Sequence, residues 1–141
     1  MSKKIILLIT TLLLSQSCVY SQNIFNAVKN RNIEKVKEFI DDEEAVNSCD
    51  EEKKTPLSWA CFNGKTEIVK LLLPRCSDKT INLPNYCDET PLWWACFKDN
   101  TEIVRLLLPR CSDETVNLPN NDNETPLSWA CYKGNIEIVK L

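Results

Sequence analysis

The stretch Thr55-Pro56-Leu57-Ser58-Trp59-Ala60-Cys61 decides how this chain is organised, because it returns twice at a fixed spacing. It recurs from Thr90 and again from Thr125, each time 35 residues further along. A period of this length predicts stacked units of a few helices, each too small to bury its own apolar face. Neighbouring units bury that face together, and the resulting stack presents a long surface for binding.

The copies are close in sequence. Residues 55–89 and 90–124 are identical at 25 of 35 positions, and residues 125–141 match the start of the first copy at 13 of 17. A fainter copy precedes them, because residues 26–40 align with the helical part of the first full copy. We therefore expect a capping repeat at about 22–54, full repeats at 55–89 and 90–124, and an incomplete repeat at 125–141.

Each unit is predicted to contain two short helices, the first of which begins at the Thr-Pro pair. Threonine accepts hydrogen bonds from free backbone amides at a helix N-cap, and proline suits the first helical position. Gly64 and Gly134 mark the end of this helix, where a left-handed residue is often needed. Asp99 and Arg31 hold the equivalent places.

The second helix is expected from Thr66, with Thr66 and Thr101 as caps, and it should stop before Pro74 and Pro109. We expect i,i+3 ion pairs along this helix. These are Glu67 with Lys70, Glu102 with Arg105, and Glu137 with Lys140. The stretches 81–85 and 116–120 follow and are predicted to be extended connectors that lead into turns.

This order of helix, tight turn, helix and extended turn resembles the ankyrin repeat. The resemblance is carried by Thr-Pro-Leu, Ala-Cys, the turn glycine and Glu-Ile-Val-Lys-Leu-Leu-Leu, and it covers roughly residues 23–141. It implies an all-α solenoid that binds proteins. Three features depart from the family. Ser58, Trp93 and Ser128 stand where it has histidine, a Cys-Ser-Asp stretch with two extra residues follows the second helix, and tryptophan replaces its following leucine at Trp59, Trp94 and Trp129.

Residues 1–21 have the layout of a secretory signal peptide, because Lys3 and Lys4 precede an apolar stretch that is followed by small residues. We therefore expect an exported protein: periplasmic, secreted or attached to the cell envelope. An apolar helix that caps the stack is the alternative. Cys18 is a candidate lipidation site, in an imperfect lipoprotein motif, and a membrane would be involved only through such an anchor.

Charge argues against a nucleic-acid partner. Cleavage after residue 21 would remove two of the 17 basic residues, which leaves 15 against 20 acidic ones and a net charge of −5. Nucleic-acid binding requires a basic face, so a protein partner is favoured.

Seven cysteines would remain after cleavage. Equivalent residues of stacked units lie about 8–10 Å apart, which is too far for a disulfide. Cys61, Cys96 and Cys131 are therefore predicted to be small buried residues. Cys49 and Cys87 lie in turn regions and are better candidates for pairing or exposure.

The binding surface is predicted from positions at which the two full repeats differ and from aromatic residues at one helical position. The resemblance places both on the concave groove and its turn tips. The aromatic residues are Phe62, Phe97 and Tyr132, together with Trp93 and Tyr86, and packing against a neighbouring unit is an equally weighted alternative for them. Trp59, Trp94 and Trp129 are assigned to the core. The full predicted partner-binding set is Phe62, Asn63, Tyr86, Glu89, Trp93, Phe97, Lys98, Asp122, Tyr132 and Lys133.

The sequence does not favour an enzyme. It has no histidine, no Cys-x-x-Cys pair and only two, separated, glycines, so triads, zinc sites and phosphate loops are not expected. We expect no cofactor. The alternatives to a protein-binding module are an envelope protein anchored through Cys18 and a fragment of a longer array. The last repeat lacks a polar closing helix, which predicts self-association through its apolar face.

Overall fold

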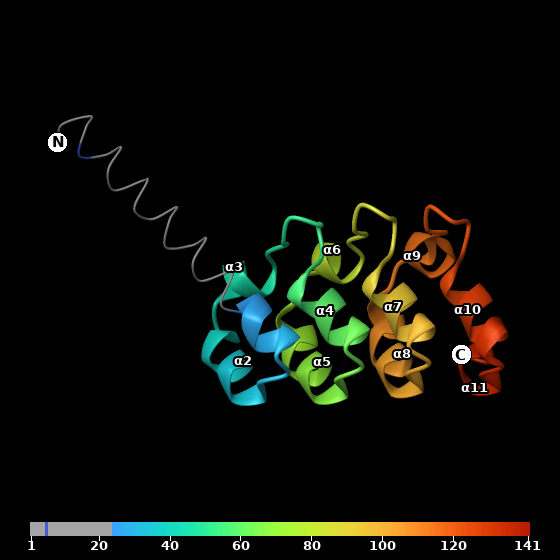
Figure 1. Cartoon of the computed structure of the whole chain (residues 1–141), viewed down its shortest axis with the longest axis horizontal. Coiled ribbons are helices and arrows are strands. Elements are labelled where there is room, and N and C mark those ends of the chain that lie inside the picture. The colour runs from blue at the N-terminus through green and yellow to red at the C-terminus, as the bar shows by residue number, and fades with distance from the viewer. Residues whose placement is uncertain (1–4, 6–23) are drawn as a thin grey trace.

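The computed structural model describes Ile5 and residues 24–141. The helix pairs lie side by side along the long axis of the molecule, and the segments that join successive repeats extend from one edge (Figure 1). The described residues form helices and turns without a strand, which confirms the predicted all-α solenoid. Apart from Ile5, the predicted signal peptide, with Cys18, lies outside the described residues.

The first unit consists of the helical residues 24–29 followed by α2 (Ile33–Phe39) and α3 (Glu43–Val46). Both named helices have a polar N-cap, because Asn32 accepts from the backbone N–H of Lys35 and Asp42 accepts from that of Ala45.

The two full repeats have the same succession of elements. The first contains α4 (Pro56–Phe62), α5 (Thr66–Leu72), the 3₁₀ turn η1 (Leu73–Arg75) and α6 (Asp78–Ile81). The second contains α7 (Pro91–Phe97), α8 (Thr101–Leu107), η2 (Leu108–Arg110) and α9 (Asp113–Asn117). The last repeat contains α10 (Pro126–Lys133) and α11 (Ile136–Val139).

The predicted start and end of the first helix are confirmed. Thr55, Thr90 and Thr125 each cap the helix through a side-chain oxygen, and proline occupies the first turn. The residues at the tight turn all have a positive φ: Arg31 (58°), Gly64 (63°), Asp99 (58°) and Gly134 (70°). The turn therefore keeps one backbone conformation although its residue type changes.

Two predictions about the rest of the repeat are wrong. Thr66 and Thr101 do not cap the second helix, because each is its first helical residue and the caps are Lys65 and Asn100. The predicted connectors are also partly helical: α6 takes in Ile81, and α9 takes in Val116 and Asn117.

The short helices α6 and α9 form because serine precedes them at the N-cap. Ser77 accepts from the N–H of Thr80, and Ser112 accepts from that of Thr115. The stretch that departs from the family, Cys-Ser-Asp, is thus a helix start.

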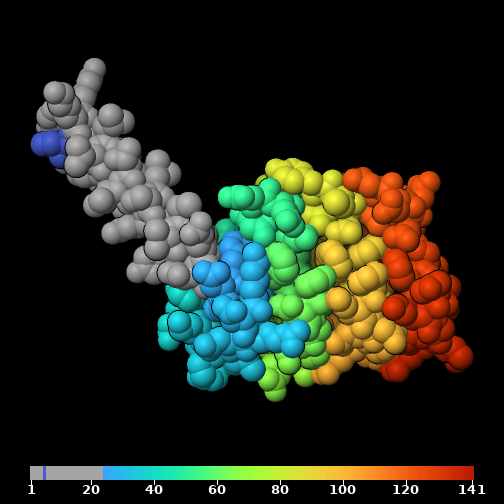
Figure 2. Space-filling model, in the orientation of Figure 1, coloured from blue at the N-terminus to red at the C-terminus, as the bar shows by residue number. Residues whose placement is uncertain are grey.

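The core runs continuously from the first unit into the last repeat, and each unit forms a slab between its neighbours (Figure 2). The main helix contacts join elements of the same or of adjacent repeats, such as α4 with α7 and α7 with α10. Leu57, Ile68 and Leu72 are fully buried in the first full repeat, and Leu92, Ile103 and Leu107 repeat them in the second.

The turns that precede α4, α7 and α10 are called fingers here and comprise residues 50–54, 85–89 and 120–124. One side chain closes each finger: Oδ1 of Asp50, Asn85 or Asn120 accepts from the backbone N–H groups two and four residues later. Neighbouring fingers are joined by backbone hydrogen bonds, from Tyr86 to Glu52 and from Asn121 to Cys87.

The ion pairs of α5 and α8 run between repeats, whereas α2 of the first unit has an i,i+3 pair, Glu34 with Lys37. The ammonium of Lys70 contacts Glu102 at 2.5 Å, and the guanidinium of Arg105 contacts Glu137 at 2.6 Å. The predicted i,i+3 pairs within these helices are therefore wrong. Each basic side chain therefore pairs with the glutamate at the start of the next repeat's second helix, and not with the glutamate of its own helix.

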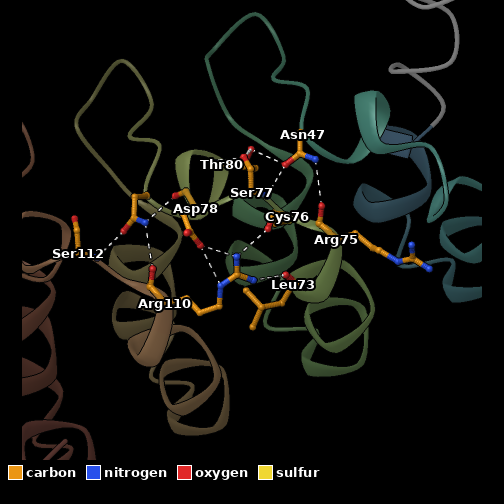
Figure 3. Close-up of polar contacts among 10 residues, drawn as sticks. Asn47, Leu73, Arg75, Cys76, Ser77, Asp78, Thr80, Arg110 and Ser112 are labelled. Atoms are coloured by element: carbon orange, nitrogen blue, oxygen red, sulfur yellow. Dashed lines mark hydrogen bonds and ion pairs between the residues drawn. The ribbon is translucent and has the colours of Figure 1, made fainter.

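Asparagine side chains also join the repeats, through a set of contacts that we call the latch (Figure 3). Asn47 Oδ1 accepts from the N–H of Ser77 (2.8 Å) and the hydroxyl of Thr80 (2.7 Å), and its Nδ2 donates to the carbonyl of Arg75 (3.2 Å). One repeat later, Asn82 accepts from the N–H of Ser112 at 2.8 Å.

Arginine side chains add contacts to the latch that run from the later repeat back to the earlier one. The Arg110 guanidinium donates to the carbonyls of Leu73 and Cys76, each at 3.0 Å, and contacts the Asp78 carboxylate at 2.6 Å (Figure 3). The Leu73 carbonyl also accepts from the N–H of Cys76, and the charged guanidinium adds a second, stronger donor at the repeat interface.

Candidate functional site

A row of aromatic rings crosses the three repeats on the first helices α4, α7 and α10. Ring centroids lie 5.5 Å apart for Trp59 and Phe62, and 4.8 Å apart for Phe62 and Trp94. The row continues from Phe97 to Trp129 (4.6 Å) and from Trp129 to Tyr132 (5.4 Å). These pairs meet edge to face, which is a favoured geometry for aromatic rings.

Trp93 lies inside this row and does not project from it. Its side chain is 3% exposed, stacks on Phe97 at 5.1 Å, and donates from Nε1 to the carbonyl of Glu124 at 3.0 Å. Of the two alternatives that the sequence left open for Trp93, exposure in the groove is therefore wrong and packing against the neighbouring unit is confirmed. The helix of the next repeat and its finger cover the ring, because Trp129 and Glu124 both contact it.

The other tryptophans follow the core prediction only in part. Trp94 is buried, whereas Trp59 and Trp129 are half-buried and pack against the edge of the core. All of them belong to the ring row, so the row is at once the margin of the core and a part of the surface.

Four lysines lie over these rings. Lys29 Nζ is 4.3 Å from the centroid of Trp59, and Lys54 Nζ is 5.0 Å from Trp59 and 5.5 Å from Trp94. Lys98 lies 4.4 Å from Phe62 and 5.3 Å from Phe97, and Lys133 lies 5.7 Å from Phe97. Each cation is attracted by the negative ring face. We call the rings Trp59, Phe62, Trp93, Trp94, Phe97, Trp129 and Tyr132, with these four lysines, the ladder face.

The lysines differ in their charge partners. Lys29 lies 3.8 Å from the Asp50 carboxylate, and Lys54 lies 2.7 Å from that of Glu52. Within residues 24–141, no carboxylate pairs with Lys98 or Lys133. The ladder face thus presents two exposed ammonium groups whose charge no acid of the described chain neutralises.

Indole N–H groups of the ladder face are not all satisfied. Trp59 Nε1 donates to Asp50 Oδ2 at 2.8 Å, whereas the buried Nε1 atoms of Trp94 and Trp129 have no acceptor among the described residues. Asparagine explains the difference, because Asn85 and Asn120 stand where the first finger has Asp50. Aspartate has one oxygen for the finger and a second for the indole, and asparagine has only the first.

The predicted binding residues are distributed over three environments. Five are exposed: Tyr86, Lys98, Asp122, Tyr132 and Lys133. Four are half-buried: Phe62, Asn63, Glu89 and Phe97. Asn63 donates to the carbonyl of Val28 at 3.3 Å, and Glu89 accepts from Asn85 at 2.8 Å, so both hold the fold together.

The structure brings these residues to two places. Phe62, Phe97, Lys98, Tyr132 and Lys133 lie together on the ladder face, where Tyr132 is 79% exposed. Tyr86, which is 72% exposed, and Asp122 lie on the fingers. The sequence analysis missed Lys29 and Lys54, because their approach to the rings depends on the stacking of two repeats.

The cysteines within 24–141 are all thiols. Burial of Cys61 and Cys96 is confirmed, but Cys131 is exposed because no described helix covers that side of α10. Burial raises the pKa of Cys96 to about 12, aided by the neighbouring Cys111 and Asp99, so this thiol is protonated near neutrality. Burial likewise raises the pKa of Cys61 well above its ordinary value. Cys49 and Cys87 are exposed.

The described residues contain neither a group of three or more acidic, cysteine or histidine side chains that could hold a metal ion, nor a helix long and apolar enough to cross a membrane.

Comparison with known proteins identifies the repeat. The family described as ankyrin repeats, in three copies, matches residues 9–85 and 75–141. No curated protein matches the chain. Ankyrin repeats are generally protein–protein interaction modules and typically carry no catalytic site. The succession of capped helices, left-handed turns and paired fingers and the family match agree, and the chain belongs to the ankyrin-repeat family.

Proposed function

We propose that this protein is an interaction module that binds a protein partner through the ladder face, with the fingers as a second contact. The observation that carries the proposal is the unbroken row of rings over three repeats, which ends in an exposed Tyr132 and carries the exposed Lys98 and Lys133. Aromatic side chains and neighbouring charges of this kind dominate the binding energy of many protein interfaces.

Affinity capture from the native source with two variants tests this proposal. Phe97→Leu/Tyr132→Ala alters the ladder face, and Tyr86→Ala/Asp122→Ala alters the fingers. A partner that is captured by the unaltered chain and lost by the first variant supports the ladder face, provided that circular dichroism shows intact helices. Loss only with the second variant moves the site to the fingers, and capture by both variants contradicts both surfaces.

We also propose that the protein is exported. The support is the order of Lys3 and Lys4, an apolar stretch and small residues in the first 21 positions. Expression with a C-terminal tag and mass spectrometry of the mature chain test this: a new N-terminus at Gln22 is expected. A mature protein that begins at Cys18 and leaves the membrane fraction on Cys18→Ala would favour the envelope-anchored alternative.

The last repeat supports self-association as a further property. Leu127, Ile136 and Val139 are exposed apolar side chains on α10 and α11, and the two full repeats bury the residues equivalent to Leu127 and Val139. A second copy of the chain that covers this face should give a dimer whose population rises with concentration. Light scattering that shows a monomer at high concentration, with the last repeat protected from hydrogen exchange, would contradict this.

A further inference from the structure

Lysine side chains, and not free aromatic rings, are what a partner meets first on much of the ladder face. Lys98 lies between the rings of two successive repeats, Phe62 and Phe97, and Lys133 lies in the same way between Phe97 and Trp129. The rings hold the two ammonium groups in place and cover one side of each. The other side is available, because both lysines are exposed and neither has a carboxylate partner within residues 24–141.

The two lysines occupy equivalent positions of adjacent repeats, 35 residues apart. Packed helices of adjacent repeats lie about 8–10 Å apart, so the two ammonium groups repeat at about that distance. A polyproline II segment has three residues per turn and rises about 3.1 Å per residue, so it presents the same side every 9 Å or so. Side chains three residues apart on such a segment therefore match the spacing of the lysines.

Aromatic surfaces also suit this conformation. Proline-rich segments dock into grooves lined by aromatic side chains, and their preformed shape reduces the entropy lost on binding. Phe97 is half-buried and is shared by both lysines, and the exposed Tyr132 packs against Trp129, the second ring beneath Lys133. Charge and shape on this face thus point to the same kind of ligand.

We propose that the ladder face binds an acidic polyproline II segment of the partner, in which two carboxylates three residues apart contact Lys98 and Lys133. This inference rests on the proposed function and names the chemistry of its partner. It also explains why an acidic chain can have an acidic ligand: Asp50 and Glu52 neutralise the lysines at the N-terminal end of the face, and Lys98 and Lys133 keep a local positive charge.

The test is isothermal titration of the full chain with three nine-residue peptides. The first repeats Glu-Pro-Pro three times, the second repeats Lys-Pro-Pro, and the third has the composition of the first with its glutamates adjacent. We expect the first peptide to bind best and its affinity to fall as salt is raised. No binding of the first peptide, or equal binding of the second, would overturn the acidic ligand. Equal binding of the third would overturn the three-residue spacing.

Two charge-matched variants assign the contact. Lys98→Gln/Lys133→Gln should weaken the first peptide about tenfold, as expected for the loss of two exposed ion pairs. Lys79→Gln/Lys140→Gln removes the same charge from lysines that contact no ring of the ladder face, and it should change the affinity less than twofold. Equal effects of the two variants would overturn the assignment.

The same lysine variant separates this inference from the proposed function. If Lys98→Gln/Lys133→Gln still captures the native partner and Phe97→Leu/Tyr132→Ala does not, the ladder face binds a protein but not through acidic residues. If neither captures it while both remain helical, both proposals are supported.

Discussion

The second full repeat and the last repeat begin with nearly the same residues but differ sharply in burial. Leu92 is 1% exposed and Leu127 is 54% exposed, although both follow Thr-Pro at the start of a capped helix. Cys96 is buried and Cys131 is exposed. Helix formation is therefore set within each repeat, whereas burial is supplied by the repeat that follows. Pairs of equivalent residues can be used to measure how much stability that neighbour provides.

Leu92→Ala and Leu127→Ala should show the largest difference in stability between the two repeats. The first leaves a cavity between α7 and its neighbours and should reduce the free energy of unfolding by about 2–5 kcal/mol. The second removes a side chain that is mostly in water, so a loss of well under ~1 kcal/mol is expected. Urea unfolding followed by circular dichroism measures both. Equal losses would show that the last repeat is covered in solution.

The rate of thiol labelling should also differ between the buried Cys96 and the exposed Cys131. The thiolate is the reactive form, and the raised pKa of Cys96 keeps this group protonated until the pH approaches 12. We expect Cys131 to react with a maleimide on the order of 100-fold faster than Cys96 at pH 8, because Cys96 also requires local opening. Peptide mass mapping measures each site. Similar rates at the two sites would contradict the buried environment of Cys96.

The latch predicts a smaller difference between Asn82 and Asn117. Asn82 bonds across the repeat interface to Ser112 and Arg110, whereas Asn117 bonds only to Asp113 of its own helix. Asn82→Ala should cost about 1–2 kcal/mol, because it leaves an amide and a carbonyl at the interface without their partner. Asn117→Ala should cost less than about 0.5 kcal/mol. Thermal unfolding of the two variants provides the check, and equal melting temperatures would contradict the latch.

Transfer of the first finger's chemistry to the second should give the smallest effect. Asn85→Asp/Glu89→Lys reproduces Asp50 and Lys54, and it supplies the missing acceptor for Trp94 Nε1. The gain should be about 1 kcal/mol over Glu89→Lys alone, which removes the Asn85–Glu89 bond without adding an acceptor. A downfield shift of the Trp94 indole proton in NMR spectra would show the new bond. No gain over the single variant would mean that the indole is already satisfied.

The sequence was informative about features that lie within one repeat. The Thr-Pro helix starts and the left-handed residues Gly64 and Asp99 follow from local chemistry, whereas the helical path continues through Pro74 as the 3₁₀ turn η1. The short helices α6 and α9 also had a local signal, the serine caps Ser77 and Ser112, which the connector prediction overlooked.

The features that escaped prediction lie between repeats. Glu102 could pair with Arg105 on its own helix or with Lys70 of the previous repeat, and only the stacking decides for Lys70. Trp93 is buried because the next repeat covers it. Lys98 reaches Phe62 because the stacking of the two repeats brings α7 against α4. The sequence named Lys98 and Lys133 as candidate binding residues, but not their position over the rings of two repeats, and it missed Lys29 and Lys54.

Nearest-neighbour packing also has a mechanical consequence. The main helix contacts and the latch join adjacent repeats, so tension applied to the two ends is resisted by one interface at a time. Because the interfaces are held by the same kinds of contact, the repeats should detach one after another under force. Each full repeat of 35 residues should then lengthen the chain by about 120 Å as it becomes extended. A pulling experiment would record this as a sawtooth with nearly equal teeth, and the protein would yield in steps under load.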